Sequence, residues 1–244
     1  MNKSKIISAF LFSIALIVVA NILGKSWSKS HNSFQTISIT GLGQQDFKSD
    51  LVVWNASFSR SASTLADANK FINNDITLIK TFLTSKGVAE NEITFATVKI
   101  NRDYKSIYNT QGNVVGSEFD GFTLNQQVII ESKNLEVIEK MAQEIGDVIE
   151  KGIELSANEP DYYYTKLKDL KIELLKTATQ DGYNRAQTIA KNADSTVGSL
   201  KNATMGVFQI TGQNSNEDYS WGGSFNTKAK LKTASITVKL EFDL

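Results

Sequence analysis

The spacing of hydrophobic residues changes along the chain, and the order of these changes is what most constrains the fold. Residues 234–242, "ASITVKLEF", alternate apolar and polar side chains, the period of a strand with one buried face. Residues 65–83 instead carry an apolar residue every three or four positions, the spacing of one helix face. That face consists of Leu65, Ala68, Ile72, Ile76, Ile79 and Leu83.

The whole pattern predicts the element order β β α β β α β α β β. Strands are expected over 33–41, 50–60, 92–104, 119–132, 199–212 and 234–242, with an extended segment at 152–164. Helices are expected over about 65–86, 135–149 and 165–193, with Thr64 as the first cap and Gly87 after its end. This order does not alternate as a doubly wound parallel sheet does. It predicts an α+β fold, a largely antiparallel sheet with about three amphipathic helices packed on it.

The stretch "TGLGQQD", residues 40–46, places two glycines between the first two predicted strands. A dinucleotide fingerprint needs a third glycine, where this chain has Asp46, and a following helix, where this chain has a predicted strand. A phosphate-binding P-loop would need a Gly-Lys-Ser/Thr ending, which is absent. Gly41 and Gly43 are therefore predicted to form a tight or bulged connection, where a positive φ favours glycine.

An 18-residue apolar run, Ile6–Leu23, lies between lysines near the amino terminus and precedes a polar linker. Its length is at the lower limit for a membrane-spanning helix and slightly long for the core of a signal peptide. We expect residues 1–33 to be an N-terminal hydrophobic helix, acting as a membrane anchor or cleaved signal, plus the linker. Residues 34–244 are expected to form one α+β domain in the periplasm, tethered to the inner membrane or released by cleavage.

Charge and composition remove several classes of function. The first 33 residues carry four lysines and no acid, so residues 34–244 carry 22 basic against 26 acidic residues, a balance that argues against nucleic acid as the main partner. The chain has no cysteine, and its only histidine, His31, lies in the linker, so zinc sites, thiolate catalysis and a catalytic triad are not expected.

Carboxylates remain the only route to acid–base catalysis, and the candidates flank one predicted strand. They are Glu150, Glu154, Glu159 and Asp161. Charges at such positions are typical of a solvated strand edge, so a carboxylate-dependent hydrolase is the least favoured hypothesis. We predict no catalytic, cofactor-binding or metal-binding residues and no cofactor.

Two groups of aromatic residues have alternative readings. Tyr162, Tyr163 and Tyr164 are consecutive, so in a strand they alternate between core and surface, and a surface tyrosine would suit a subunit contact. Tyr219, Trp221 and Phe225 lie in a polar, glycine-rich loop that we expect to be mobile. They either pack on the domain or contact a partner, and the sequence leaves that choice open.

Four segments, in order, resemble the SIMPL-domain family, exported bacterial proteins that include YggE-like and periplasmic immunogenic proteins. They are "ISITGLGQQDFKSDLVVWNASFS", "ADANKFINNDITLIKTFLTSKGVAENEIT", "DGYNRAQTIAKNADSTVGSL" and "ASITVKLEFDL". The resemblance implies an α+β fold, export, assembly of some members into oligomers and a link to oxidative-stress tolerance. It implies no enzymatic activity and no catalytic residues.

The leading hypothesis is therefore a non-enzymatic cell-envelope protein that acts through self-assembly or contacts with an envelope protein partner, with the membrane reached through the N-terminal segment. The alternative is a periplasmic small-ligand binding protein with a pocket between sheet and helices. That pocket is predicted to be lined by Trp54, Tyr104 and the aromatic residues of the late loop.

Overall fold

The computed structural model describes residues 12–14, 16–23, 25, 36–218 and 220–244. Within the predicted N-terminal segment, residues 12–14 and 16–23 are helical, and the other residues of the apolar run lie outside the described part. Among the residues described, no helix has both the length and the apolar character needed to cross a membrane. The choice between anchor and cleaved signal stays a prediction.

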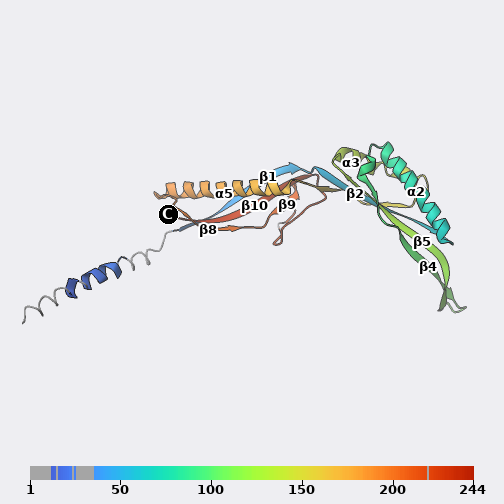
Figure 1. Cartoon of the computed structure of the whole chain (residues 1–244), viewed down its shortest axis with the longest axis horizontal. Helices are drawn as coiled ribbons and strands as arrows, with labels where there is room; N and C mark the ends of the chain where they lie inside the picture. The colour runs from blue at the N-terminus through green and yellow to red at the C-terminus, as the bar shows by residue number, and fades with distance from the viewer. Residues whose placement is uncertain (1–11, 15, 24, 26–35, 219) are drawn as a thin grey trace, which may run out of the picture. The chain divides into compact units, whose positions relative to one another are not determined.

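The chain forms two compact units (Figure 1). The larger contains residues 43–177 and 207–237, apart from the undescribed residue 219, and the smaller contains the described residues up to 42 together with residues 178–206 and 238–244. The boundary falls within β1 (Thr36–Lys48), α5 (Leu167–Asn192) and β10 (Leu231–Asp243).

The larger unit is built on a six-stranded sheet whose pairs are all antiparallel. Its strands are β2 (Leu51–Ala62), β3 (Ile93–Phe95), β4 (Lys99–Tyr108), β5 (Val114–Ser132), β6 (Leu155–Ala157) and β7 (Asp161–Tyr163). The order is β3-β5-β2-β6, with β4 also paired to β5 and β7 to β2. The hairpin of β4 and β5 confirms the hairpin predicted between residues 92 and 132.

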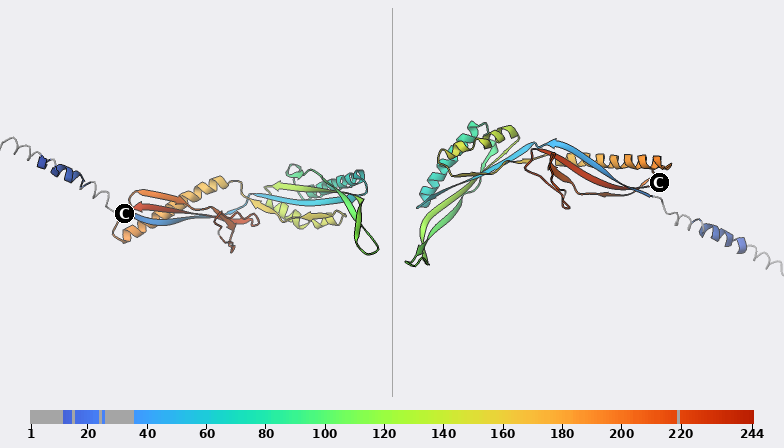
Figure 2. Two further views of the ribbon diagram at one scale, coloured as in Figure 1. Left: turned by 90° about the horizontal axis from the view of Figure 1, so that it is seen from below. Right: turned by 180° about the vertical axis from the view of Figure 1, so that it is seen from behind.

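Helices cover one face of this sheet, because β2 and β5 present alternate apolar side chains there (Figures 1 and 2). They are α2 (Leu65–Ser85), α3 (Leu135–Gln143), the single turn α4 (Gly146–Ile149) and the 3-10 turn η1 (Glu90–Glu92). The core between the layers includes Val52, Trp54, Phe58, Ile72, Ile79, Leu83, Leu124, Ile130 and Ile138. The hydroxyl of Thr64 accepts a hydrogen bond from the backbone N–H of Asp67, which confirms the predicted cap.

The smaller unit contains the first part of β1, the second part of β10, β8 (Leu200–Met205) and the second part of α5. In its sheet β10 lies between β1 and β8, and β10 and β8 are antiparallel. The small residues along the second half of α5 predict that it packs close to its neighbour, and Ala178, Ala186 and Ala190 are buried, whereas Ala193 is exposed. In the larger unit the first part of β10 pairs with β9 (Gln209–Gly212), so the strand predicted over 199–212 is two strands.

The glycine pair corrects one prediction. "TGLGQQD" is not a turn, because β1 runs through it from Thr36 to Lys48, and neither Gly41 nor Gly43 has a positive φ. Both glycines are buried, two residues apart and therefore on one face of the strand. A Cβ on Gly41 would lie 2.5 Å from the backbone nitrogen of Gly182 in α5 and 2.8 Å from its Cα. Glycine is needed here because strand and helix backbones touch, and not because the chain turns.

A carboxylate secures the same contact. Asp181 of α5 accepts a hydrogen bond of 2.8 Å from the backbone N–H of Leu42, and Arg185 forms an ion pair of 2.9 Å with Asp181. The hydrogen bond from Leu42, then that from Arg185, lowers the pKa of Asp181. The helix thus supplies an acceptor to β1, which has β10 as its only neighbour among the described strands.

The α+β class and the antiparallel pairing are confirmed. The strands divide between two sheets, whereas the sequence suggested one. The single domain predicted for residues 34–244 stays a prediction.

We expect Gly41→Val to lower the free energy of unfolding by on the order of 3 kcal/mol, because its side chain would overlap the backbone of α5. Gly43→Val should also destabilise the fold, since Gly43 is buried in the same strand. Gly146→Ala is the control, because a Cβ at Gly146 meets nothing within 4 Å. Urea denaturation measures all three, and a Gly41→Val protein as stable as the control would contradict this packing.

Candidate interaction surface

The hairpin of β4 and β5 continues past the end of β2 as a two-stranded ribbon. β2 stops at Ala62, which pairs with Phe122, whereas β4 and β5 remain paired from Asp103 and Gly121 to Tyr108 and Val114 (Figures 1 and 2). We call residues 103–121 the arm. A two-stranded ribbon without a packed face has little stability of its own in water, so the exposed side chains of the arm need an explanation.

The arm carries six large apolar or aromatic side chains that are each 41–63% exposed. They are Tyr104, Ile107, Tyr108, Val114, Val115 and Phe119. Single exposed apolar residues are ordinary, but a contiguous set on a narrow ribbon is typical of a surface that another molecule covers. The arm is therefore the main candidate interaction surface of the larger unit.

Aromatic contacts connect the arm to the core. Tyr104 and Phe119 are cross-strand neighbours whose ring centroids lie 5.9 Å apart at a steep angle, and Phe119 meets Phe122 at 5.1 Å. Phe122 is half-buried and packs against the core cluster. Edge-to-face contacts of this kind favour one relative position of the rings, so they orient the base of the arm on the sheet.

The arm also has an ion pair and two register shifts, features that limit uncontrolled strand pairing. Lys105 forms an ion pair of 2.7 Å with Glu118 directly across the ribbon, and register shifts interrupt the pairing at Asp103/Tyr104 and Ile107/Tyr108. Charges and bulges at an open edge reduce unspecific association. The exposed apolar residues thus lie among features that restrict how a second strand can approach.

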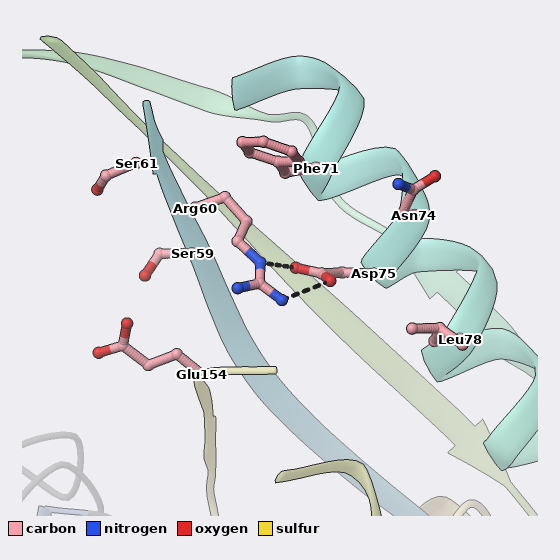
Figure 3. A pocket seen from close by; sticks show the side chains of 8 residues that line it. All are labelled: Ser59, Arg60, Ser61, Phe71, Asn74, Asp75, Leu78 and Glu154. Atoms are coloured by element: carbon pink, nitrogen blue, oxygen red, sulfur yellow. Dashed lines mark hydrogen bonds and ion pairs between the residues drawn. The ribbon is translucent and has the colours of Figure 1, made fainter. Parts of the chain in front are cut away.

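A groove of about 520 Å³ lies beside the end of β2 (Figure 3). In it Arg60 of β2 reaches Asp75 of α2 with two hydrogen bonds, 2.5 Å from Nε and 2.9 Å from an Nη, and donates another of 2.8 Å to the carbonyl of Gly152. Asp75 is only 2% exposed, so the guanidinium supplies the charge that its burial requires. The groove is also lined by Ser59, Ser61, Phe71, Asn74, Leu78 and Glu154.

The late loop between β9 and β10 is tied to the larger unit by hydrogen bonds. The buried amide of Gln209 donates to the carbonyl of Ser220 and accepts from the backbone N–H of Ser224. Trp221 nevertheless is 100% exposed, and Phe225 is half-exposed. Trp221 therefore does not pack on the larger unit, which was one of the two alternatives for this loop. Tyr219 lies outside the described residues. Contact with a partner stays a prediction.

A buried lysine holds the base of this loop. Lys232 of β10 is 2% exposed and donates its ammonium to the carbonyl of Asn226. Burial lowers the pKa of Lys232 to about 8, against the opposing effect of Glu217 and Asp161. Asp161 in turn accepts from Lys228 and Thr227, and these hydrogen bonds hold its pKa below the usual value although burial acts to raise it.

The predicted carboxylate candidates are not gathered into one site. Glu154 lines the groove beside Arg60. Asp161, on β7, instead forms an ion pair with Lys228 and accepts a hydrogen bond from Thr227. Glu150 and Glu159 are exposed. In the described part of the chain no three His, Cys, Asp or Glu residues lie close enough to hold a metal ion, and His31 lies outside that part.

The pocket lining proposed for a small ligand is wrong. Trp54 is fully buried in the core, Tyr104 is on the arm, and Trp221 is fully exposed, so these residues do not share a cavity. The three tyrosines are all half-buried, with Tyr162 donating a hydrogen bond of 2.8 Å to Glu139 and Tyr164 meeting the ring of Phe47 at 4.8 Å. A subunit contact through these tyrosines stays a prediction.

The sequence did not predict that the arm is an exposed apolar surface, and it did not predict the groove beside Arg60. The signal for the arm was the apolar content of "YKSIYNTQGNVVGSEF", which has no alternation that would bury one face. Lys232 gave no signal, because a lysine in a strand is normally exposed.

One comparison places the chain in a family. The sequence model described as "SIMPL: Protein of unknown function (DUF541)" matches residues 37–242, which is most of the chain. The protein therefore belongs to the SIMPL family. No curated protein matches it significantly.

We expect the buried Lys232 to make stability depend on pH. Its folded pKa, about 8, lies below the ordinary 10.5, so between these values the unfolded chain binds more protons and raising the pH stabilises the fold. Lys232→Met should lose this contribution. Denaturation of both proteins from pH 7.5 to 10.5 should show wild type gaining stability relative to the variant, and a constant difference would contradict the low pKa.

Removal of the carboxylate partner of Arg60 should destabilise the larger unit. Asp75→Asn leaves the guanidinium without its counter-charge, and we expect a loss of roughly 2 kcal/mol, less than a fully buried pair because Arg60 is partly exposed. The double variant Arg60→Met/Asp75→Leu should recover most of the loss. Urea denaturation tests both, and a double variant no better than Asp75→Asn would contradict the charge argument.

Proposed function

We propose that this SIMPL-family protein is an exported, non-enzymatic cell-envelope protein that acts through self-assembly. The observation that supports the proposal is the arm, where exposed apolar side chains and unpaired strand edges occur together. A second copy is the partner that we favour, because the arm carries both signs of charge, Lys105 beside Glu118 and Asp120, and so suits a surface of the same mixed character.

The proposed location is the periplasm, tethered to the inner membrane by the N-terminal segment or released after its cleavage. The support is the apolar run Ile6–Leu23 with its flanking lysines. The absence of enzymatic activity is proposed from the sequence, which has no cysteine and one histidine. A contribution to envelope or oxidative-stress tolerance follows only from the resemblance to the family.

A small-ligand binding function is the second candidate. The groove of about 520 Å³ beside Arg60 lies between a strand and a helix, as this alternative requires, although its lining differs from the predicted one. A thermal-shift screen with envelope metabolites tests it, because a ligand that binds the native state must raise the melting temperature.

Self-assembly is tested by sedimentation of the full-length protein in mild detergent over a range of concentrations. We expect association that Tyr104→Ser weakens about thirtyfold, since truncating a central aromatic anchor costs about 2 kcal/mol. Ile149→Ser is the matched control, an exposed apolar residue outside the arm. A wild-type protein that stays monomeric at high concentration would overturn the proposal.

The mass of the protein recovered from membrane and soluble fractions tests the location. An intact chain in the membrane fraction is expected for an anchor, and a chain shortened at its amino terminus in the soluble fraction is expected for a cleaved signal. An intact chain found only in the soluble fraction would contradict both forms.

A further inference from the structure

The outer edge of β2 is open over its last four residues. On this side β6 pairs with residues 56–58 and β7 with residues 51–53, so no strand in the described part of the chain pairs with residues 59–62. The backbone N–H of Asn158 donates to the carbonyl of Asn55. Because backbone groups alternate in direction along an antiparallel strand, Ser59 and Ser61 direct their N–H and C=O to this same side.

The open edge lies at the groove beside Arg60. A four-residue edge is about 13 Å long at the usual rise of a strand. On the helix side, Phe71 and Leu78 of α2 are 45% and 39% exposed, so an added strand would find both backbone partners and an apolar wall (Figure 3). Arg60 is held by Asp75 and Gly152, which fixes the floor of the groove.

The chain itself supplies a strand with the complementary properties. Among the strands that the structure describes, β4 pairs only with β5, and no described strand pairs with its other edge. β4 carries Lys99, Arg102, Asp103 and Lys105, a net charge of +2, whereas the groove carries Arg60, Asp75 and Glu154, a net charge of −1. The opposite edge of the arm, on β5, carries Glu118 and Asp120 and has the wrong sign.

We propose that the open edge of β4 in one copy adds as a strand to residues 59–62 of β2 in a second copy. The contact is β-augmentation, in which main-chain hydrogen bonds supply affinity and side chains supply specificity. Apolar side chains of the arm then cover Phe71 and Leu78, and the cationic strand lies beside Glu154. The inference rests on the proposed self-assembly and names the two surfaces that meet.

The contact joins two different surfaces, so it is heterologous. Each copy offers one arm and one open edge, and each contact leaves a free arm on one end and a free edge on the other. Association through this contact therefore continues from copy to copy. A symmetric arm-to-arm contact would instead stop at two copies.

Complementation of two defective full-length variants tests the inference in mild detergent. Tyr104→Glu impairs the arm, and Phe71→Lys impairs the groove, because it removes an apolar side chain and sets a cation against the cationic strand, while placing a good helix former on α2. Both replaced side chains are half-exposed, and circular dichroism with melting temperature checks the fold. Each variant alone should remain monomeric, whereas an equimolar mixture should form dimers of one copy each, because only one intact arm and one intact edge can meet.

The other outcomes separate the two proposals. If Phe71→Lys alone associates as wild type does while Tyr104→Glu does not, the arm contacts another surface, so self-assembly stands and this inference fails. A mixture that remains monomeric also overturns the inference. A monomeric wild type overturns self-assembly itself. A small molecule that raises the melting temperature of wild type but not of Phe71→Lys would then assign the groove to that ligand.

Cross-linking gives a second measurement with milder substitutions. Because the sequence has no cysteine, Ser59→Cys and Ser106→Cys each introduce a single thiol. A mixture of the two proteins treated with a short bismaleimide should give a product that joins β2 to β4, at several times the yield of either protein alone. Products that join only two Ser106→Cys chains would overturn the inference in favour of arm-to-arm pairing.

Discussion

The antiparallel pairing of β5 is the interaction on which the larger unit depends. β5 is 19 residues long and pairs with β2, β3 and β4, and its inner half supplies Leu124, Val128 and Ile130 to the core beneath α2 and α3. Its neighbour β2 ends at Ala62, so among the described strands the outer part of β5 pairs only with β4. The difference in length between these strands creates the arm. The short β6 in turn leaves the end of β2 open.

Hydrophobic periodicity in the sequence was sufficient to predict a helix or strand where one face of that element is buried. The spacing of residues 65–83 predicted α2 to within about two residues, and the alternation of residues 234–242 lies within β10, where Ala234, Ile236 and Val238 are buried. The glycine pair was misread because a glycine signals either a turn or a close approach of two backbones. Only the position of Gly182 on α5, 141 residues along the chain from Gly41, distinguishes the two.

The arm was harder to predict from the sequence, since its exposure depends on where the neighbouring strands end. The sequence of β4 does not indicate that both faces of this strand remain exposed, because the burial of β4 depends on where β2 ends. The same holds for Asp75, a polar position on the buried side of α2 that becomes acceptable only when Arg60 reaches it from β2. Lys232 belongs to the same group, since its burial follows from the path of the late loop. Pairings between distant residues carry no signal in local spacing.

An open strand edge is a hazard because another strand can pair with it, and the edge of β4 and the end of β2 differ in how they are restrained. β4 carries charged side chains, and two register shifts interrupt its pairing with β5, so the ribbon is not a flat hydrophobic template for another strand. The edge of β2 is short and recessed between Glu154 and the side chains of α2. A short recessed edge admits only a narrow projecting strand, and β4 at the edge of the arm is such a strand. Restraints that suppress general aggregation are therefore compatible with the one pairing that we propose, and such selectivity is the physical requirement for ordered assembly.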